Sequence, residues 1–336
     1  VVYATAGGVY TVTVTLTDLN YVWQGEDGVI ELTWTVTAAE NAIEEIVFDD
    51  EWTYFGARDP ETPSATAAFG EPVFAYAVLP VDFAGDYSAL VWTDAMPSDV
   101  GSYVLRASVA ATDSWNAAEG YFTFTILPAE IALSGVKGYT GTYDAEEHNA
   151  RTAGSAAVDG SAVTWQYALT NDEDTVWSTE QIAFTDAGTY TVYCKLSAVN
   201  HADAFVELTV VIRKAQLVVR VGTATIDYGE EAPSAFGVTY AGFVGGEDES
   251  VLTGSLTFTV VGYTAGSAAG SYTVRASGLE AENYEIDYRT GTLFVRSVDL
   301  TVTIAAGGGV YGGTITPATA TLHGAYEDDE VGVILT

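Results

Sequence analysis

The side chains of this sequence that could do acid–base or nucleophilic chemistry are few and scattered. The histidines are His148, His201 and His323, and none stands within a serine or cysteine nucleophile motif. The glycine-rich stretch at 307–309 lies between expected strands, so it does not form a phosphate-binding loop before a helix. Glycosidic cleavage needs two carboxylates fixed across a cleft, and short repeated β domains offer no evident cleft. The sequence therefore predicts a protein that is not an enzyme.

Carboxylates are the abundant reactive groups, and they gather in short runs within expected loops. Hard oxygen ligands of this kind are those that calcium takes, although the spaced ligands of an EF-hand loop are absent. Calcium bound near the domain joints is one prediction, and simple solvation of a charged surface is the alternative. No other cofactor is expected. The candidate calcium ligands are Asp49, Asp50, Glu51, Asp172, Asp174, Glu247, Asp248, Asp328 and Asp329.

The composition limits the partners of the chain. Its 336 residues include 11 lysines and arginines against 46 acidic residues, for a formal net charge of −35. Because phosphate contacts need cations, nucleic acid is excluded as a partner, and an anionic membrane surface is disfavoured. No segment has the ~18 apolar residues of a membrane span. Cys194 is the single cysteine, so it forms no disulfide within the chain and should be a small buried hydrophobe.

Two sequence markers recur along the chain with nearly the same period. A Gly-x-Tyr element places tyrosines at 10, 103, 190 and 272, in steps of 93, 87 and 82 residues, and an asparagine follows each one 10 to 13 residues later. A second tyrosine marker, at 54, 143, 228 and 311, has steps of 89, 85 and 83 residues. Two separate markers that share one period predict tandem domains. The residues expected to have an equivalent structural role are Tyr10, Tyr103, Tyr190 and Tyr272.

Alternating strands and short joints place the expected domain boundaries. The domains are residues 1–38 (the C-terminal half of a repeat), 42–128, 130–213, 215–296 and 297–336 (the N-terminal half of a further repeat). The joints contain no Gly/Ser tract, so neighbouring domains should be held with limited bending.

Each complete repeat contains short runs in which apolar and polar residues alternate, such as 103–109 and 121–126. Because no segment has a sustained apolar period of 3.6, the nearest helical candidate is a single turn at 247–252. This pattern predicts an all-β chain: a tandem array of small Ig-like antiparallel β-sandwich domains joined by short linkers. A ubiquitin-like β-grasp is the alternative, but it needs a crossing helix. The stretch 186–190 resembles the tyrosine corner of immunoglobulin-like domains.

Six ordered stretches stand out in the fourth repeat: Ile226-Asp227-Tyr228-Gly229, 242–248, 252–254, 269–272, 283–286 and 291–293. Through these stretches the fourth repeat resembles the MBG-type repeat of large bacterial surface proteins. The other repeats resemble the bacterial Ig-like repeats that accompany it. The third repeat departs from the pattern, since it lacks the early proline and carries His201 beside the marker asparagine. The resemblance implies a secreted, wall- or envelope-attached protein, and it supplies no catalytic residues.

We therefore expect a non-enzymatic extracellular stalk or spacer segment of a bacterial surface adhesin or surface filament, located at the bacterial cell surface. Its partners would be other domains of the same protein or neighbouring copies. One alternative is a glycan- or mucin-binding module that contacts host or cell-wall glycans. A second is a self-assembling filament subunit whose half-domains are completed by neighbouring copies. The exposed loop aromatics expected to contact glycans are Trp23, Trp52, Trp115 and Trp177.

Overall fold

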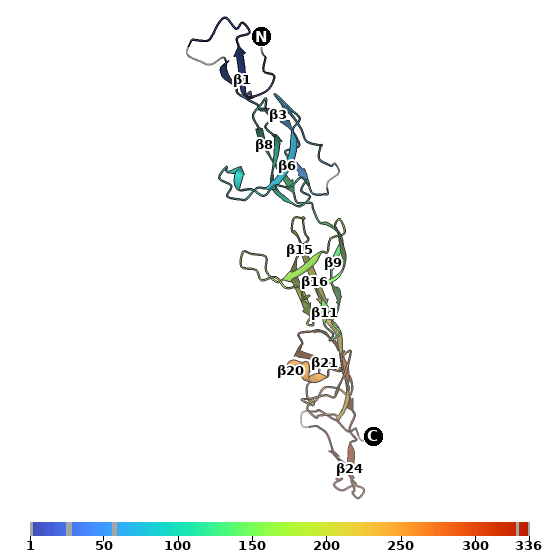
Figure 1. Cartoon of the computed structure of the whole chain (residues 1–336). Coiled ribbons are helices and arrows are strands. Elements are labelled where there is room, and N and C mark those ends of the chain that lie inside the picture. The colour runs from blue at the N-terminus through green and yellow to red at the C-terminus, as the bar shows by residue number, and fades with distance from the viewer. Residues whose placement is uncertain (1–2, 25–28, 56–58, 327–328, 335–336) are drawn as a thin grey trace. The chain divides into compact units, whose positions relative to one another are not determined.

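The computed structural model describes residues 3–24, 29–55, 59–326 and 329–334. Within these ranges the chain consists of β-strands, loops and two one-turn 3-10 helices, with no α-helix (Figure 1). The all-β prediction is confirmed, and the β-grasp alternative is wrong because no helix crosses a sheet in the described part. The chain divides into two compact units. One comprises Val1–Ser134, Ser155–Gln166 and Cys194–Val206, and the other comprises Gly135–Gly154, Tyr167–Tyr193 and Glu207–Thr336.

Strands occur within each of the predicted repeats. The first half-repeat contains β1 (Gly8–Thr15) and β2 (Val29–Val36). The second repeat contains β3 (Ile43–Val47), β4 (Glu51–Thr53), β5 (Ser64–Ala67), β6 (Val73–Val78), η1 (Tyr87–Ala89), β7 (Gly101–Val109) and β8 (Ala118–Leu127). The third contains β9 (Ala132–Gly138), β10 (Thr140–Thr142), β11 (His148–Asn149), β12 (Arg151–Ala157), β13 (Thr164–Ala168), β14 (Ala183–Phe184), β15 (Gly188–Ser197) and β16 (Ala204–Arg213).

The fourth repeat contains β17 (Ala215–Val221), β18 (Thr223–Asp227), β19 (Val238–Ala241), η2 (Glu249–Val251), β20 (Thr253–Val260), β21 (Gly270–Glu280), β22 (Tyr284–Arg289) and β23 (Gly291–Arg296). The single helical turn expected at 247–252 is present: it is η2, a one-turn 3-10 helix. The last half-repeat contains β24 (Thr301–Ala305) and β25 (Thr319–His323), which pair with each other.

The same sheet order recurs in the three complete repeats. The four-stranded sheets have the orders β4-β8-β7-β6, β10-β16-β15-β13 and β18-β23-β21-β20. The second layer contains β3-β5 in the second repeat and β19-β17-β22 in the fourth. The consecutive strands β21 and β22 lie in different sheets.

One edge of each four-stranded sheet departs from the expected antiparallel pairing. The short strands β4, β10 and β18 run parallel to the last strands β8, β16 and β23. Each of these short strands follows the first strand of its repeat and pairs with the last strand in parallel register. A prediction from local alternation contains no information about this long-range pairing.

Alternation along the strands builds the core of each repeat. In β17 the side chains of Ala215, Leu217, Val219 and Val221 are buried while those between them are half-buried or exposed, as strand geometry requires. Full burial of one such leucine or valine stabilises the fold by about 1.5–3 kcal/mol. Every buried residue of the described chain is apolar or aromatic. Cys194 is fully buried, which confirms its expected role as a small hydrophobe.

Candidate functional site: contacts between neighbouring repeats

The four Gly-x-Tyr tyrosines share one hydrogen bond. Each hydroxyl group donates to the carbonyl oxygen four residues earlier, and the pairs are Tyr10–Ala6 (2.6 Å), Tyr103–Asp99 (2.8 Å), Tyr190–Asp186 (3.0 Å) and Tyr272–Ala268 (2.7 Å). The glycine lets the ring lie over the backbone, because a Cβ at Gly188 would stand 2.7 Å from the Tyr190 ring. In each repeat the tyrosine therefore anchors the loop that leads into its own strand, and it does so at an equivalent position.

The second tyrosine marker makes contacts between repeats. Tyr54 donates to Asp159 Oδ2 (2.5 Å), Tyr143 donates to Glu247 Oε1 (2.6 Å), and Tyr228 donates to Asp329 Oδ1 (2.8 Å). Tyr54 directly follows β4, Tyr143 follows β10, and Tyr228 follows β18. Each carboxylate belongs to the next predicted repeat along the chain. Both members of every pair lie in the same compact unit. The parallel edge strand thus carries the tyrosine to the end of its own sheet.

Hydrogen bonding to these carboxylates changes the proton affinities of the partners. The hydrogen bond from Tyr143 to the Glu247 carboxylate, helped by burial, raises the pKa of Tyr143 to about 12. Hydrogen bonds from Ser161 and from Tyr54 lower the pKa of Asp159 to about 2. In both cases the bond favours the form that is present at neutral pH, a protonated phenol facing an ionised carboxylate.

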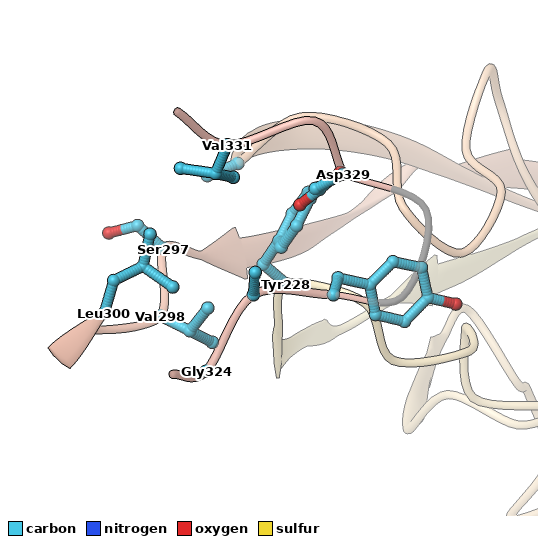
Figure 2. Close-up of a pocket in the computed structure, with 10 residues that line it drawn as sticks. Tyr228, Ser297, Val298, Leu300, Gly324, Asp329 and Val331 are labelled. Carbon is cyan, nitrogen blue, oxygen red and sulfur yellow. The ribbon is translucent and has the colours of Figure 1, made fainter. Parts of the chain in front are cut away.

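The third of these pairs borders an apolar pocket of about 240 Å³ (Figure 2). Tyr228 and Asp329 are on its wall, and Val298, Leu300 and Val331 supply apolar surface. The ring of Tyr228 also meets a second tyrosine ring, at position 326, edge to face at 5.9 Å. Among its described lining residues the pocket has one carboxylate, which already accepts a hydrogen bond, so these residues offer packing between two repeats and no evident acid–base pair.

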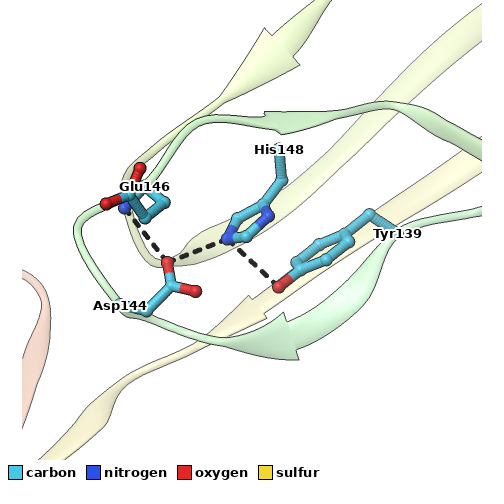
Figure 3. A network of polar contacts seen from close by, with 4 residues as sticks. All are labelled: Tyr139, Asp144, Glu146 and His148. Atoms are coloured by element: carbon cyan, nitrogen blue, oxygen red, sulfur yellow. Dashed lines mark hydrogen bonds and ion pairs between the residues drawn. The ribbon is translucent and has the colours of Figure 1, made fainter.

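A histidine network closes the turn between β10 and β11 (Figure 3). Nε2 of His148 lies 2.9 Å from Asp144 Oδ1 and 3.1 Å from the hydroxyl oxygen of Tyr139, whose ring stacks on the imidazole at 3.9 Å. The backbone N–H of Glu146 also donates to Asp144. That bond, followed by the one from His148, lowers the pKa of Asp144. Ala145 has a left-handed backbone (φ 65°), so the network stabilises a tight turn.

The calcium candidates are distributed among different contacts. Asp49 accepts from the backbone N–H of Glu61, Asp172 accepts from that of Asp174, and Asp248 caps η2 by accepting from that of Ser250. Glu247 and Asp329 accept from tyrosines. Glu51 begins β4 and Asp50 directly precedes it, and Asp328 lies outside the described residues.

No group of three or more His, Cys, Asp or Glu that could hold a metal ion occurs in the described ranges. Calcium binding therefore stays a prediction. Calorimetry with calcium chloride tests it, since heat together with a raised melting temperature would support it and the lack of both would rule it out.

The four tryptophans expected to be exposed on loops are all half-buried. Trp52 lies in β4 and stacks on Phe124 of the core at 5.1 Å, so its assignment to an exposed loop is wrong. Alternation along β4 turns this side chain inward. Trp115 stacks on Phe69 at 5.2 Å. Trp23 and Trp177 are likewise only partly accessible, so these four tryptophans offer little free aromatic surface to a sugar.

Sequence reasoning missed the carboxylates that receive the tyrosines. Asp159 had no marker of its own, and Glu247 was noted only as part of an acidic run. The periodic tyrosines at 54, 143 and 228 were the available signal, because a residue that recurs at the same place in each repeat is expected to make the same contact there.

Comparisons with known proteins found a family model for part of the chain and several solved structures with some likeness to it. Residues 217–294 match the family model of the MBG domain (YGX type). No curated protein matches the sequence. Among solved structures, Drosophila N-cadherin EC1-4 is similar at 9% identity over 88% of this chain and 85% of that chain, with a TM-score of 0.24. The I67-I69 fragment of titin is similar at 11% identity over 77% and 96%, with a TM-score of 0.28.

These structural likenesses are too weak to carry an inference about function. The described part of the chain contains no helix with the length and hydrophobicity that crossing a membrane would take. The family match spans β17 to β23 almost completely and includes the Tyr228-Gly229 pair. The fourth repeat of this chain is similar to the MBG domain (YGX type).

Proposed function

We propose that the chain is a non-enzymatic stalk or spacer segment of an extracellular bacterial surface protein. The observation that supports this role is the recurring contact between repeats, in which the tyrosine that follows the parallel edge strand of one repeat donates to a carboxylate of the next. A binding or catalytic protein has no need to repeat the same contact at each joint. A spacer does, because its length depends on every joint.

The pairing at the sheet edge suits a chain that is loaded along its length. In β18 and β23, parallel pairing runs from Thr223 with Thr292 to Asp227 with Arg296. Tension that pulls β18 and β23 in opposite directions shears all these hydrogen bonds together. Shear loads the bonds at the same time, whereas a hairpin pulled at its open end loses them one by one.

Screening on a glycan array tests the stalk role against the glycan-binding alternative. The full chain should give only background signal on mucin-type and cell-wall glycans. Specific binding that is lost in a Trp115→Ala variant, and kept in a Trp52→Phe variant, would contradict the stalk role and favour a binding module. Trp52→Phe serves as the matched control because that side chain belongs to the core.

A self-assembling filament is the second candidate function. The observation that favours it is the exposed apolar surface on the two-stranded sheets: Leu32 on β2 is 58% exposed, and Ile304 on β24 is 61% exposed. Sheets of this kind bury such side chains when a second layer covers them. Light scattering of the purified chain decides this point, since growth of polymers with concentration supports assembly and a strict monomer rejects it.

A further inference from the structure

The marker asparagines of the third and fourth repeats bind the repeat that precedes them. The side-chain amide of Asn200 donates to Asp99 Oδ1 (2.9 Å), and its oxygen accepts from the backbone N–H of Val100 (3.0 Å). Asn283 makes the same pair of bonds, to Asp186 Oδ1 (3.0 Å) and from the N–H that follows this aspartate (2.8 Å). Two joints, one in each compact unit, thus share a two-point bridge between asparagine and aspartate.

Each aspartate in this bridge also belongs to a tyrosine corner. The carbonyl oxygen of Asp186 accepts from Tyr190 within its own repeat, while the carboxylate accepts from Asn283 of the next repeat. Asp99 does the same with the tyrosine at 103 and the asparagine at 200. The corner therefore holds the backbone from which the bridging carboxylate projects.

The asparagine loop also binds the chain segment at the start of its own repeat. The N–H of Ala129, just before β9, donates to the carbonyl oxygen of Asn200 (3.1 Å), and the N–H of Ala215, the first residue of β17, donates to that of Asn283 (2.9 Å). One loop thus binds this segment through its backbone and the preceding corner through its side chain. With no free backbone between these two attachments, the joint has little room to rotate.

We propose that the aspartate four residues before the corner tyrosine is a docking site for the asparagine loop of the following repeat. In sequence terms, Asp-x-Gly-x-Tyr in one repeat and the marker asparagine in the next together specify a closed joint. The partner that this surface recognises is a loop whose side-chain amide can donate to the carboxylate and accept from the next backbone N–H.

The first and fourth repeats lack the aspartate. Ala6 and Ala268 stand four residues before the corner tyrosines of these repeats, and each offers a carbonyl oxygen to the corner but no carboxylate to a neighbour. In keeping with this, Asn116 of the second repeat donates to Glu40 of the linker (3.1 Å) and to no corner residue among those described. Joints that follow these two repeats should bend more readily than those that follow the second and third.

Exchange of the Ala187 amide hydrogen in the full chain tests the docking site. Asn283→Ala removes both bridge bonds, so this amide should exchange about tenfold faster, the factor that corresponds to a net bond of ordinary strength. Asn283→Asp loses the bond to the Asp186 carboxylate and places two carboxylates together, so it should also accelerate exchange relative to the original chain. Adding Asp186→Asn to that variant reverses the polarity of the bridge, and the Ala187 N–H can still donate to the carboxylate introduced opposite it, so exchange should return close to the original rate.

Two results would overturn the proposal: unchanged exchange in Asn283→Ala, or failure of the reversed pair to recover. Exchange at β21 and β23 serves as the folding control, because these strands should be unaffected in every variant. This inference deepens the stalk role and rests on it, yet amide exchange is measured without load. Amide exchange can therefore refute the bridge while the chain still proves to be a spacer. It can equally support the bridge while the spacer role is refuted.

Discussion

Replacing Tyr143 with phenylalanine removes one hydroxyl group from the joint between the third and fourth repeats and keeps the ring. Tyr143 is only 4% exposed, and its hydroxyl donates to Glu247 Oε1 at 2.6 Å. Tyr284 donates to the other carboxylate oxygen, and the two tyrosine rings meet edge to face at 5.5 Å. The variant leaves the aromatic packing in place, so the measured change reports the hydrogen bond to the carboxylate.

The expected loss is about 1.5 kcal/mol of local stability at neutral pH. Hydrogen bonds to charged groups contribute about 1.5–3 kcal/mol net, and the lower end applies because Glu247 is half-buried and keeps its bond from Tyr284. This corresponds to roughly tenfold more frequent opening of the joint. Native-state hydrogen exchange measures it at the Tyr143 amide, which donates to the carbonyl oxygen of Arg213 at 2.8 Å.

The pH dependence gives a second signature with a definite sign. The pKa of Tyr143 is raised to about 12, so its contribution is present below pH ~10, the ordinary value, and is lost as the pH rises from about 10 to about 12. The phenylalanine variant should lack this component. Tyr193→Phe is the matched control, since Tyr193 is half-buried and its hydroxyl has no hydrogen bond within the described residues. Equal exchange in the two variants would refute the contact as a stabilising element.

Three further predictions concern the tyrosine corner of the fourth repeat, the joint between the second and third repeats, and the core. Tyr272→Phe removes the bond to Ala268 and should lower the stability of the fourth repeat by about 0.5–1.5 kcal/mol, as measured by denaturant titration. Asp159 has its pKa lowered to about 2, so its contact with Tyr54 should persist at pH ~4 and weaken as the pH falls towards about 2. NMR of the Tyr54 ring follows this change, which Asp159→Asn should abolish. Leu217→Ala empties a fully buried site and should cost about 2–5 kcal/mol in thermal unfolding, whereas a cost below about 1 kcal/mol would contradict the assigned core.

Strands with strong alternation could be found from the sequence, and strands without it could not. The segments that became β7 and β8 alternate bulky apolar and polar residues and were placed within a few residues of their bounds. The segments of β9 and β12 are rich in glycine, alanine and serine, so they carry little periodic signal. Their strand form comes from pairing with each other, which no local window contains.

The sequence predicts one partner of each joint contact, the recurring tyrosine or asparagine, but not its acceptor. The periods of the tyrosines and asparagines identified Tyr143 and Asn283 as recurring residues, but the acceptors follow no shared motif. Asp159 and Glu247 sit in loops of different sequence, and chain geometry alone brings them to the tyrosines. The two bridging aspartates, at 99 and 186, were within reach of sequence reasoning, because each stands four residues before a corner tyrosine.

Single-molecule extension of the full chain tests the stalk role most directly. The proposal predicts separate force peaks for the three complete repeats, each releasing at most roughly 280 Å, the extended length of about 84 residues at about 3.3 Å each. The fourth repeat should yield last, because its parallel edge pairs Thr223–Asp227 with Thr292–Arg296, whereas β4 and β10 pair over shorter stretches. Smooth extension without peaks, or early rupture of the fourth repeat, would contradict it.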